Sequence, residues 1–224
     1  MSMEENDMNG KNIIPDGEVI SALNILEQMH PEAACALEHR DPFELIIAVA
    51  LSAQTTDVSV NKVTPELFRK YPDPESLAAA DPDDVMEIIH TIGLYRNKSK
   101  NIIRLADKLV KDFEGAVPSD FKSLVSLPGV GRKTANVVLS EGFGVPRIAV
   151  DTHVFRVANR IGFTDEKDVD STEEMLMKRI PEDSWIRAHH LMIFHGRKCC
   201  SARKPSCSEC GLNGICLYNN MQNI

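Results

Sequence analysis

A glycine-rich turn of this 224-residue chain carries a lysine suited to covalent chemistry, and an aspartate that could assist it follows eighteen residues later. The turn is Leu127-Pro-Gly-Val-Gly-Arg-Lys-Thr134, between two short segments with helical patterns. Lys133 carries a primary amine, which is a nucleophile in its neutral form. Asp151 directly precedes another expected helix. Its carboxylate could cap that helix, or it could face Lys133 across a cleft and stabilise a cationic transition state.

The glycine turn does not fit the two best-known phosphate loops. A P-loop has glycine directly before Lys-Thr, where this chain has Arg132, and a dinucleotide fingerprint has a third glycine where it has Thr134. We therefore expect a hairpin between two helices, with Gly129 and Gly131 exposing backbone amides where the second helix begins. Amides at a helix start bind anions without reading sequence. The alternatives are a plain turn between two helices and, for Lys133, phosphate binding without chemistry.

Five of the six cysteines lie near the C-terminus: Cys199, Cys200, Cys207, Cys210 and Cys216. Cys207 and Cys210 are separated by two residues, and either Cys199 or Cys200 can complete four ligands with Cys216. Four converging thiolates indicate zinc or an iron–sulfur cluster. Spacing alone leaves both open and favours iron–sulfur, because structural zinc usually takes two close pairs. Arg203 and Lys204 lie in the loop between Cys200 and Cys207, where they either reach a phosphate or offset thiolate charge.

The charge is unevenly distributed. The net charge of −8 argues against a polyanion partner. However, residues 1–90 hold 18 acids and 5 bases, whereas residues 119–160, which carry the glycine turn, hold 6 bases and 3 acids. Residues 185–216, which carry the cysteines, hold 5 bases and 1 acid. The segments with the motifs are therefore basic.

The hydrophobic pattern predicts an all-α protein of about ten helices, with no convincing strand. Asp41-Pro42 and Asp81-Pro82 are helix starts, with aspartate as N-cap and proline at the first helical position. Gly93 is expected to close the second of these helices. Residues 1–16 lack periodicity and are expected to be a flexible tail. The other expected helices cover 18–30, 102–113, 121–127, 132–140, 152–161, 172–180 and 185–195.

Taken together, these motifs resemble the endonuclease III family, the helix-hairpin-helix DNA glycosylases with a 4Fe–4S cluster. Segments 127–136 and 148–153 and the spacing of Cys200, Cys207, Cys210 and Cys216 carry the resemblance. Leu51-Ser-Ala-Gln-Thr-Thr-Asp57 and Thr91-Ile-Gly-Leu-Tyr95 add to it. The resemblance covers residues 42–218. Val145 departs from the family pattern, in which we expect tryptophan, and the chain is more acidic than expected.

The resemblance implies a fold and a set of functional residues. The fold has two all-α domains with a DNA-binding cleft between them: a six-helix barrel at 35–145, and a cluster domain at 17–34 plus 146–224. Lys133 is then the Schiff-base nucleophile and Asp151 the catalytic carboxylate. Cys200, Cys207, Cys210 and Cys216 hold one 4Fe–4S cluster, which leaves Cys199 outside. The residues expected to contact DNA are Gln54, Leu94, Gly129, Gly131, Arg132, Arg203 and Lys204.

The implied activity is that of a bifunctional DNA N-glycosylase and abasic-site lyase. It would remove oxidised pyrimidines in base excision repair and cut the strand by β-elimination. The expected partner is double-stranded DNA with damaged bases or abasic sites. We expect a monomer, in the cytoplasm of a prokaryote at the nucleoid, with no membrane contact. The competing interpretations are an adenine-mispair glycosylase, which lacks the catalytic lysine, a non-catalytic DNA-binding module, and an electron-transfer protein.

Overall fold

The structure is a computed structural model that describes residues 12–222. Helices are joined by loops and turns, and no strand occurs among the described residues, which confirms the all-α prediction. The chain divides into two compact units. We call Cys35–Arg147 the central unit, and Met1–Ala34 with Ile148–Ile224 the discontinuous unit. The domain boundaries expected from the resemblance stay a prediction.

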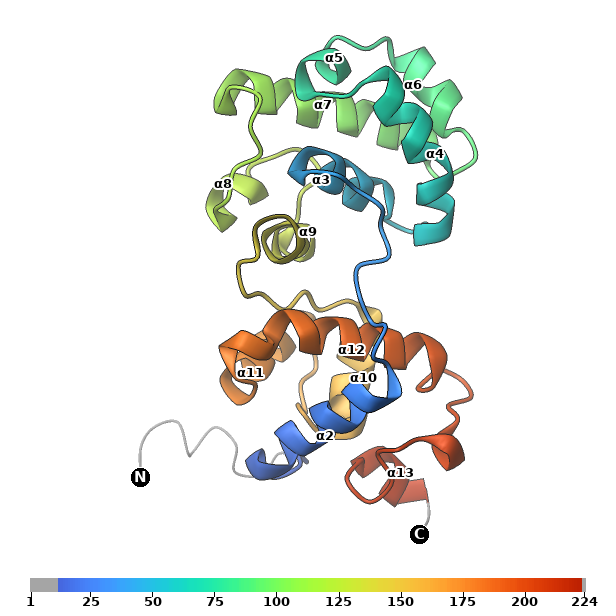
Figure 1. Cartoon of the computed structure of the whole chain (residues 1–224), viewed down its shortest axis with the longest axis vertical. Helices are drawn as coiled ribbons and strands as arrows, with labels where there is room; N and C mark the ends of the chain where they lie inside the picture. The colour runs from blue at the N-terminus through green and yellow to red at the C-terminus, as the bar shows by residue number, and fades with distance from the viewer. Residues whose placement is uncertain (1–11, 223–224) are drawn as a thin grey trace. The chain divides into compact units, whose positions relative to one another are not determined.

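The central unit is built around one helix. Within it, α3 (Pro42–Leu51) contacts α4 (Asp57–Lys70), α7 (Tyr95–Phe113), α9 (Arg132–Val137) and the π-helix η1 (Val138–Gly142) (Figure 1). Eight of the ten α3 residues are buried. A helix that is apolar on all sides belongs in a core, and α3 takes that place. The remaining helices are α5 (Pro74–Ala78), α6 (Pro82–Ile89) and α8 (Phe121–Val125).

Aspartate side chains cap four of the seven α-helices of the central unit. The Asp41 carboxylate accepts the Glu44 amide at 2.9 Å, and the Asp81 carboxylate accepts the Asp83 amide at 2.9 Å. Each bond satisfies an amide that has no partner inside its helix. Both predicted helix starts are therefore confirmed.

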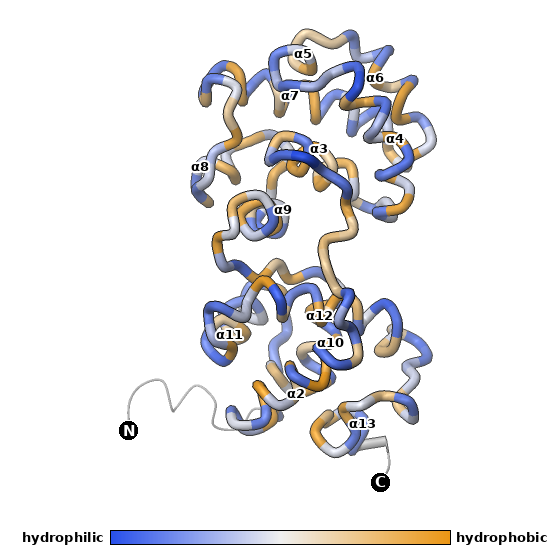
Figure 2. Tube along the Cα trace, in the orientation of Figure 1, coloured by the Kyte–Doolittle hydropathy of each residue, from blue (hydrophilic) through white to orange (hydrophobic). Residues whose placement is uncertain are grey.

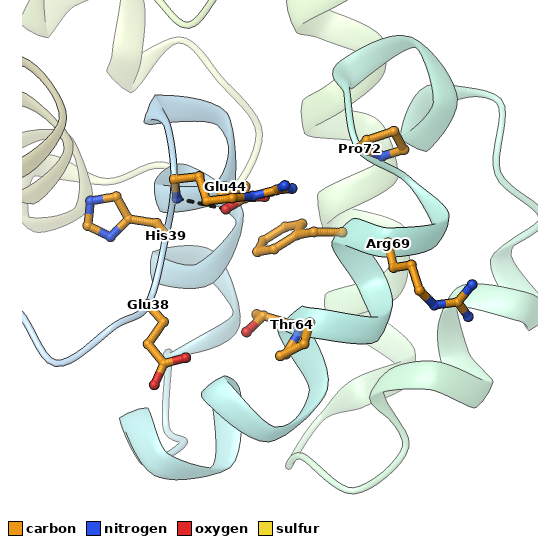
Figure 3. Close-up of a pocket in the computed structure, with 9 residues that line it drawn as sticks. Glu38, His39, Glu44, Thr64, Arg69 and Pro72 are labelled. Atoms are coloured by element: carbon orange, nitrogen blue, oxygen red, sulfur yellow. Dashed lines mark hydrogen bonds and ion pairs between the residues drawn. The ribbon is translucent and has the colours of Figure 1, made fainter.

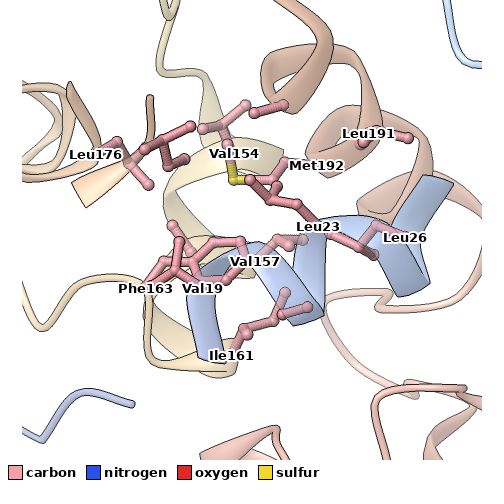
Figure 4. Close-up of a cluster of buried hydrophobic side chains, with 14 of the residues drawn as sticks. Val19, Leu23, Leu26, Val154, Val157, Ile161, Phe163, Leu176, Leu191 and Met192 are labelled. Atoms are coloured by element: carbon pink, nitrogen blue, oxygen red, sulfur yellow. The ribbon is translucent and has the colours of Figure 1, made fainter. Parts of the chain in front are cut away.

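The discontinuous unit joins one early helix to the C-terminal helices. It contains α2 (Asp16–Met29), α10 (Thr152–Ile161), α11 (Val169–Arg179), α12 (Trp185–Lys198) and α13 (Leu217–Gln222), with short 3-10 turns η2 (Glu182–Ser184) and η3 (Cys207–Glu209). Val19 and Leu26 from α2 pack with Val157 from α10 and Met192 from α12 in one buried cluster (Figure 4). Polar and apolar residues are interspersed along these helices, as amphipathic packing requires (Figure 2).

Several expected elements need correction. Helix α7 begins at Tyr95 rather than at 102, and Leu94 rather than Gly93 takes the left-handed backbone, with φ 59°. Helices α4 and α5 were not expected, because Pro65 interrupts the pattern of α4 and α5 is a single short turn.

The expected tail also ends earlier than residue 16. Ile14 is 1% exposed, and its amide donates to the Gly162 carbonyl at 2.9 Å. The apolar side chain of Ile14 belongs to the core and orders this stretch. The rest of the expected tail, residues 1–11, lies outside the described residues.

Candidate functional site

The glycine turn forms the predicted hairpin between α8 and α9. Gly129 has φ +78°, a left-handed backbone that favours glycine, and an added Cβ would meet nothing within 4 Å. The backbone conformation, rather than a lack of space, therefore calls for glycine there. Gly131 is the N-cap of α9 and supplies no capping side chain. The first amides of α9 are thus left without a side-chain acceptor from the cap, which suits an anion.

The hairpin presents two basic side chains to solvent. Lys133 and Arg132 are both exposed in the first turn of α9. The Arg132 guanidinium lies 5.7 Å from the centre of the Phe121 ring, in cation–π range. The side chains of Leu127 and Val130 are buried, and they anchor the turn in the core. The amine of Lys133 is accordingly open to a large substrate.

Asp151 is the N-cap of α10. Its Oδ1 atom accepts the amides of His153 and Val154, both at 2.8 Å. Asp151 therefore caps α10, and the two capping bonds fix the direction of its carboxylate. Both amides bond to Oδ1, so the capping bonds do not involve Oδ2. Lys133 belongs to the central unit and Asp151 to the discontinuous unit.

Gln54 and Leu94 share an unusual backbone. Both are exposed, and both have left-handed φ values, 55° and 59°. Leu94 is a large apolar side chain that is 58% exposed. Their loops are neighbours, because a Cβ added to Gly93 would lie 3.9 Å from the Gln54 carbonyl oxygen. Non-glycine residues in this region store strain and gather at functional sites.

Buried Lys98 makes a side-chain hydrogen bond to the loop that carries Gln54. Its ammonium donates to the Thr55 hydroxyl at 2.5 Å, and its residue is 6% exposed. Burial lowers the pKa of Lys98. No sequence pattern predicted this contact, because Lys98 is one of several polar residues before residue 102.

Five thiols gather in the discontinuous unit. Cys199, Cys200, Cys207, Cys210 and Cys216 are free and line one cavity. Burial, with smaller contributions from neighbouring cysteines, raises the pKa of Cys199 to about 12. Burial also raises the pKa of Cys207 and Cys216. Thiolates gathered in one cavity repel one another and need a cation to hold them as anions, so this donor set fits an iron–sulfur cluster.

Two arginines of α10 hydrogen-bond to the loop that begins at Cys200, which the sequence did not predict. Arg160 donates to the carbonyls of Ser201 and Ala202, both at 2.8 Å, and its guanidinium lies 3.4 Å from the Cys200 sulfur. Arg156 donates to the Cys200 carbonyl at 3.1 Å. Their spacing of four residues on one helix face was the available signal. Arg203 and Lys204 stay exposed on this loop.

A histidine pair adjoins the cavity. His30 Nε2 lies 3.1 Å from His195 Nδ1, and His195 Nε2 lies 3.8 Å from the Cys210 sulfur. Burial, followed by the neighbouring His30, lowers the pKa of His195 to about 4. Both rings are therefore buried and neutral near pH 7. His195 therefore occupies a core position, in contact with a cysteine.

A separate pocket in the central unit has a structural explanation. Nine residues line it, including Glu38, Thr64 and Arg69 (Figure 3). Its buried carboxylate, Glu44, accepts the Arg40 amide and the Arg40 Nε, each at 2.7 Å. The charge of Glu44 is therefore compensated by Arg40, as in a structural ion pair.

Comparisons with known proteins match nearly the whole chain. A family profile described as HhH-GPD superfamily base excision DNA repair protein matches residues 47–182. A second, described as iron-sulfur binding domain of endonuclease III, matches residues 200–216. Endonuclease III of Bacillus subtilis is 51% identical over 195 residues, which cover 87% of this chain and 89% of that protein. The chain belongs to the endonuclease III family. Endonuclease III of Escherichia coli K12 is 45% identical over 92% of this chain and 97% of its own length.

A solved structure gives the same result. A trapped endonuclease III–DNA covalent intermediate matches with a TM-score of 0.89 and 47% identity, over 95% of this chain and all of that chain. The predicted resemblance is thus confirmed. Membership of the endonuclease III family makes this chain a base excision repair enzyme, a DNA glycosylase with abasic-site lyase activity. The match over residues 200–216 also resolves the choice between zinc and iron–sulfur in favour of one iron–sulfur cluster.

No helix among the described residues is long and apolar enough to cross a membrane.

Proposed function

We propose that this enzyme releases oxidised pyrimidines from double-stranded DNA through the amine of Lys133 and then cuts the strand. The observation that carries the proposal is the exposed Lys133 in the first turn of α9, on a glycine hairpin without a capping side chain. The support from relatives is a family member solved as a covalent intermediate with DNA. A covalent intermediate requires a nucleophile, and Lys133 supplies one.

The chemistry follows from the amine. Extrusion of a damaged base requires little energy where its pairing is already weak. The Lys133 nitrogen attacks C1′ of the sugar, and the base leaves with the electrons of the glycosidic bond. Ring opening then gives an imine, which acidifies the neighbouring C2′ proton. Loss of that proton expels the 3′ phosphate and cuts the strand by β-elimination.

Asp151 stabilises the positive charge that develops on the sugar. Its capping bonds hold the carboxylate in a fixed direction before the reaction begins, and preorganised charge is what makes such groups effective. Because both bonds use Oδ1, the other oxygen remains for the substrate.

Backbone amides and basic side chains bind the phosphates. The amides of the Gly129–Gly131 turn and the side chain of Arg132 meet one stretch of the backbone, and Arg203 and Lys204 meet another. These contacts position the duplex without reading sequence. Affinity should therefore fall steeply with salt.

Gln54 and Leu94 fill the gap that the extruded base leaves. Their side chains project from two neighbouring strained loops, and Leu94 is apolar and exposed, as a wedge between bases requires.

The cluster ligands are Cys200, Cys207, Cys210 and Cys216. The family match begins at Cys200 and ends at Cys216, and all four sulfurs line one cavity. When bound, a 4Fe–4S cluster cross-links this segment, and the reaction has no redox step for it. Arg160 then presents the tied loop, and with it Arg203 and Lys204, in one conformation.

The working form is a monomer that acts in the cytoplasm of a prokaryote, on the nucleoid. The relatives described above are bacterial.

Lys133→Gln tests the proposal. Strand cleavage of a duplex with one thymine glycol should be lost, whereas binding to that duplex should stay within a few-fold of the native value. Lys62→Gln, at an exposed lysine of α4, makes the same charge change and should leave cleavage intact. Cleavage by Lys133→Gln at the native rate would contradict the proposal.

A further inference from the structure

We propose that Cys199 is a reserve ligand of the cluster, able to take the iron that Cys210 holds. This inference rests on the ligand set proposed above, in which Cys199 has no part. Cys199 is distinguished by its position, because it is the fifth thiol of the same cavity.

Three ligand atoms converge beside Cys210. The sulfur of Cys199, the sulfur of Cys210 and a ring nitrogen of His195 all lie within 4.8 Å of one another. Two sulfurs on one metal at bond lengths of about 2.3 Å can be at most about 4.6 Å apart. The Cys199 and Cys210 sulfurs therefore lie close enough to serve the same metal atom with a small side-chain movement.

The position of the Cys199 thiol selects the same ligand. It donates to the carbonyl of Ser206, the residue before Cys207, at 3.7 Å. Cys210 belongs to the group of ligand atoms around Cys199, and Cys216 does not. Cys199 is thus placed to replace Cys210 rather than Cys216.

The backbone holds Cys199 at this place. It is the C-cap of α12, where its amide donates to the His195 carbonyl at 2.9 Å. Its own carbonyl accepts the Ser206 amide at 3.0 Å, directly before the proposed ligand Cys207. Only the side chain must turn for the thiol to reach a different partner.

The exchange is balanced without a redox step. The Cys199 thiol would release a proton to solvent and hold the iron as thiolate, while Cys210 would leave as thiolate and take up a proton, so charge and electrons balance. Thiolate is the ligand type that iron–sulfur clusters prefer, so the cluster keeps four sulfur ligands.

Four alanine variants of the full-length protein test the proposal: Cys199→Ala, Cys210→Ala, the double variant, and Cys216→Ala as matched control. Alanine is used because a serine oxygen could itself bind iron. Iron and sulfide per chain, together with visible absorbance, are the readouts, and circular dichroism checks folding. We expect Cys199→Ala and Cys210→Ala to keep at least half of the native iron. The double variant and Cys216→Ala should lose most of it.

The other outcomes separate the two proposals. Loss of the cluster in Cys210→Ala, with Cys199→Ala intact, overturns the reserve role and leaves the ligand set standing. Loss in Cys199→Ala alone overturns the ligand set, because Cys199 would then be a primary ligand. A double variant that keeps its iron also overturns the reserve role and directs attention to the His195 nitrogen.

A second measurement applies if Cys210→Ala does not fold. Native protein and Cys199→Ala, which has all four proposed ligands, are treated with a ferrous-iron chelator while absorbance is followed. We expect the variant to lose its cluster at least threefold faster, because no second thiol recaptures the iron when the Cys210 bond opens. Equal rates would overturn the proposal.

Discussion

Replacing Asp151 by asparagine and by alanine separates the two roles of its carboxylate. Alanine removes both bonds to the amides of His153 and Val154. Loss of an N-cap costs about 1 kcal/mol, up to about 2. For a chain of this size each kcal/mol lowers Tm by about 2–4 °C. Asparagine caps about as well as aspartate, so it loses only the charge at the helix start, about 0.3–1 kcal/mol.

Strand cleavage should depend on the negative charge of residue 151 rather than on its capping bonds. We expect Asp151→Asn to slow strand cleavage by roughly 10²–10³-fold, as when one preorganised stabilising group is removed from a site, and yet to melt within about 3 °C of the native protein. Melting is followed by circular dichroism, and cleavage by single-turnover nicking of a labelled duplex with one thymine glycol.

Asp168→Ala is the matched control for this pair. Asp168 caps α11 in the same unit by accepting the Ser171 amide at 2.9 Å. Its alanine variant should lose stability as Asp151→Ala does and keep native cleavage. Native cleavage by Asp151→Asn would rule out a role for the charge, because the carboxylate would then be only a cap.

Three further predictions concern packing, pH and the cysteine loop. Gly162→Ala should destabilise the protein by more than about 1 kcal/mol, because φ is +96° and the new Cβ would lie 2.6 Å from Leu217 Cδ1; thermal melting measures this. Lys98→Met should raise Tm near pH 7, where burial penalises the ammonium. Because the folded pKa is lowered, the native protein gains stability as pH rises toward the ordinary lysine value, so melts near pH 10 should show a smaller difference. Arg160→Lys cannot make both hydrogen bonds to the carbonyls of Ser201 and Ala202. Under a chelator, iron should therefore leave this variant faster than it leaves the native protein.

Local chemistry explains what the sequence could predict about the fold. The Asp-Pro pairs at 41 and 81 mark helix starts because capping involves residues only two or three positions apart. The pattern of α10 is equally local, and its bounds agree with the prediction. Helix α4 was missed because its interior proline hides a pattern that packing against α3 and α6 sustains. Ile14 was missed because only the folded chain brings Gly162 to it.

The functional site likewise has features that the sequence predicts and features that it does not. The cysteine spacing and the glycine turn are short-range patterns, so cofactor and hairpin could be predicted. Strain at Gln54 and Leu94 could not be, because no residue type prefers that backbone except glycine. The contact of His195 with Cys210, and that of Cys199 with Cys210, depend on how α12 meets the loop after it, which spacing does not encode.

Borohydride trapping shows whether Lys133 forms the imine. Native protein and Lys133→Gln are each mixed with a labelled duplex containing thymine glycol, and the reductant fixes any imine. Digestion and mass spectrometry then locate the adduct. We expect an adduct on Lys133 of the native protein and none with the variant. Base release without any adduct, or an adduct on another residue, would exclude Lys133 as the nucleophile.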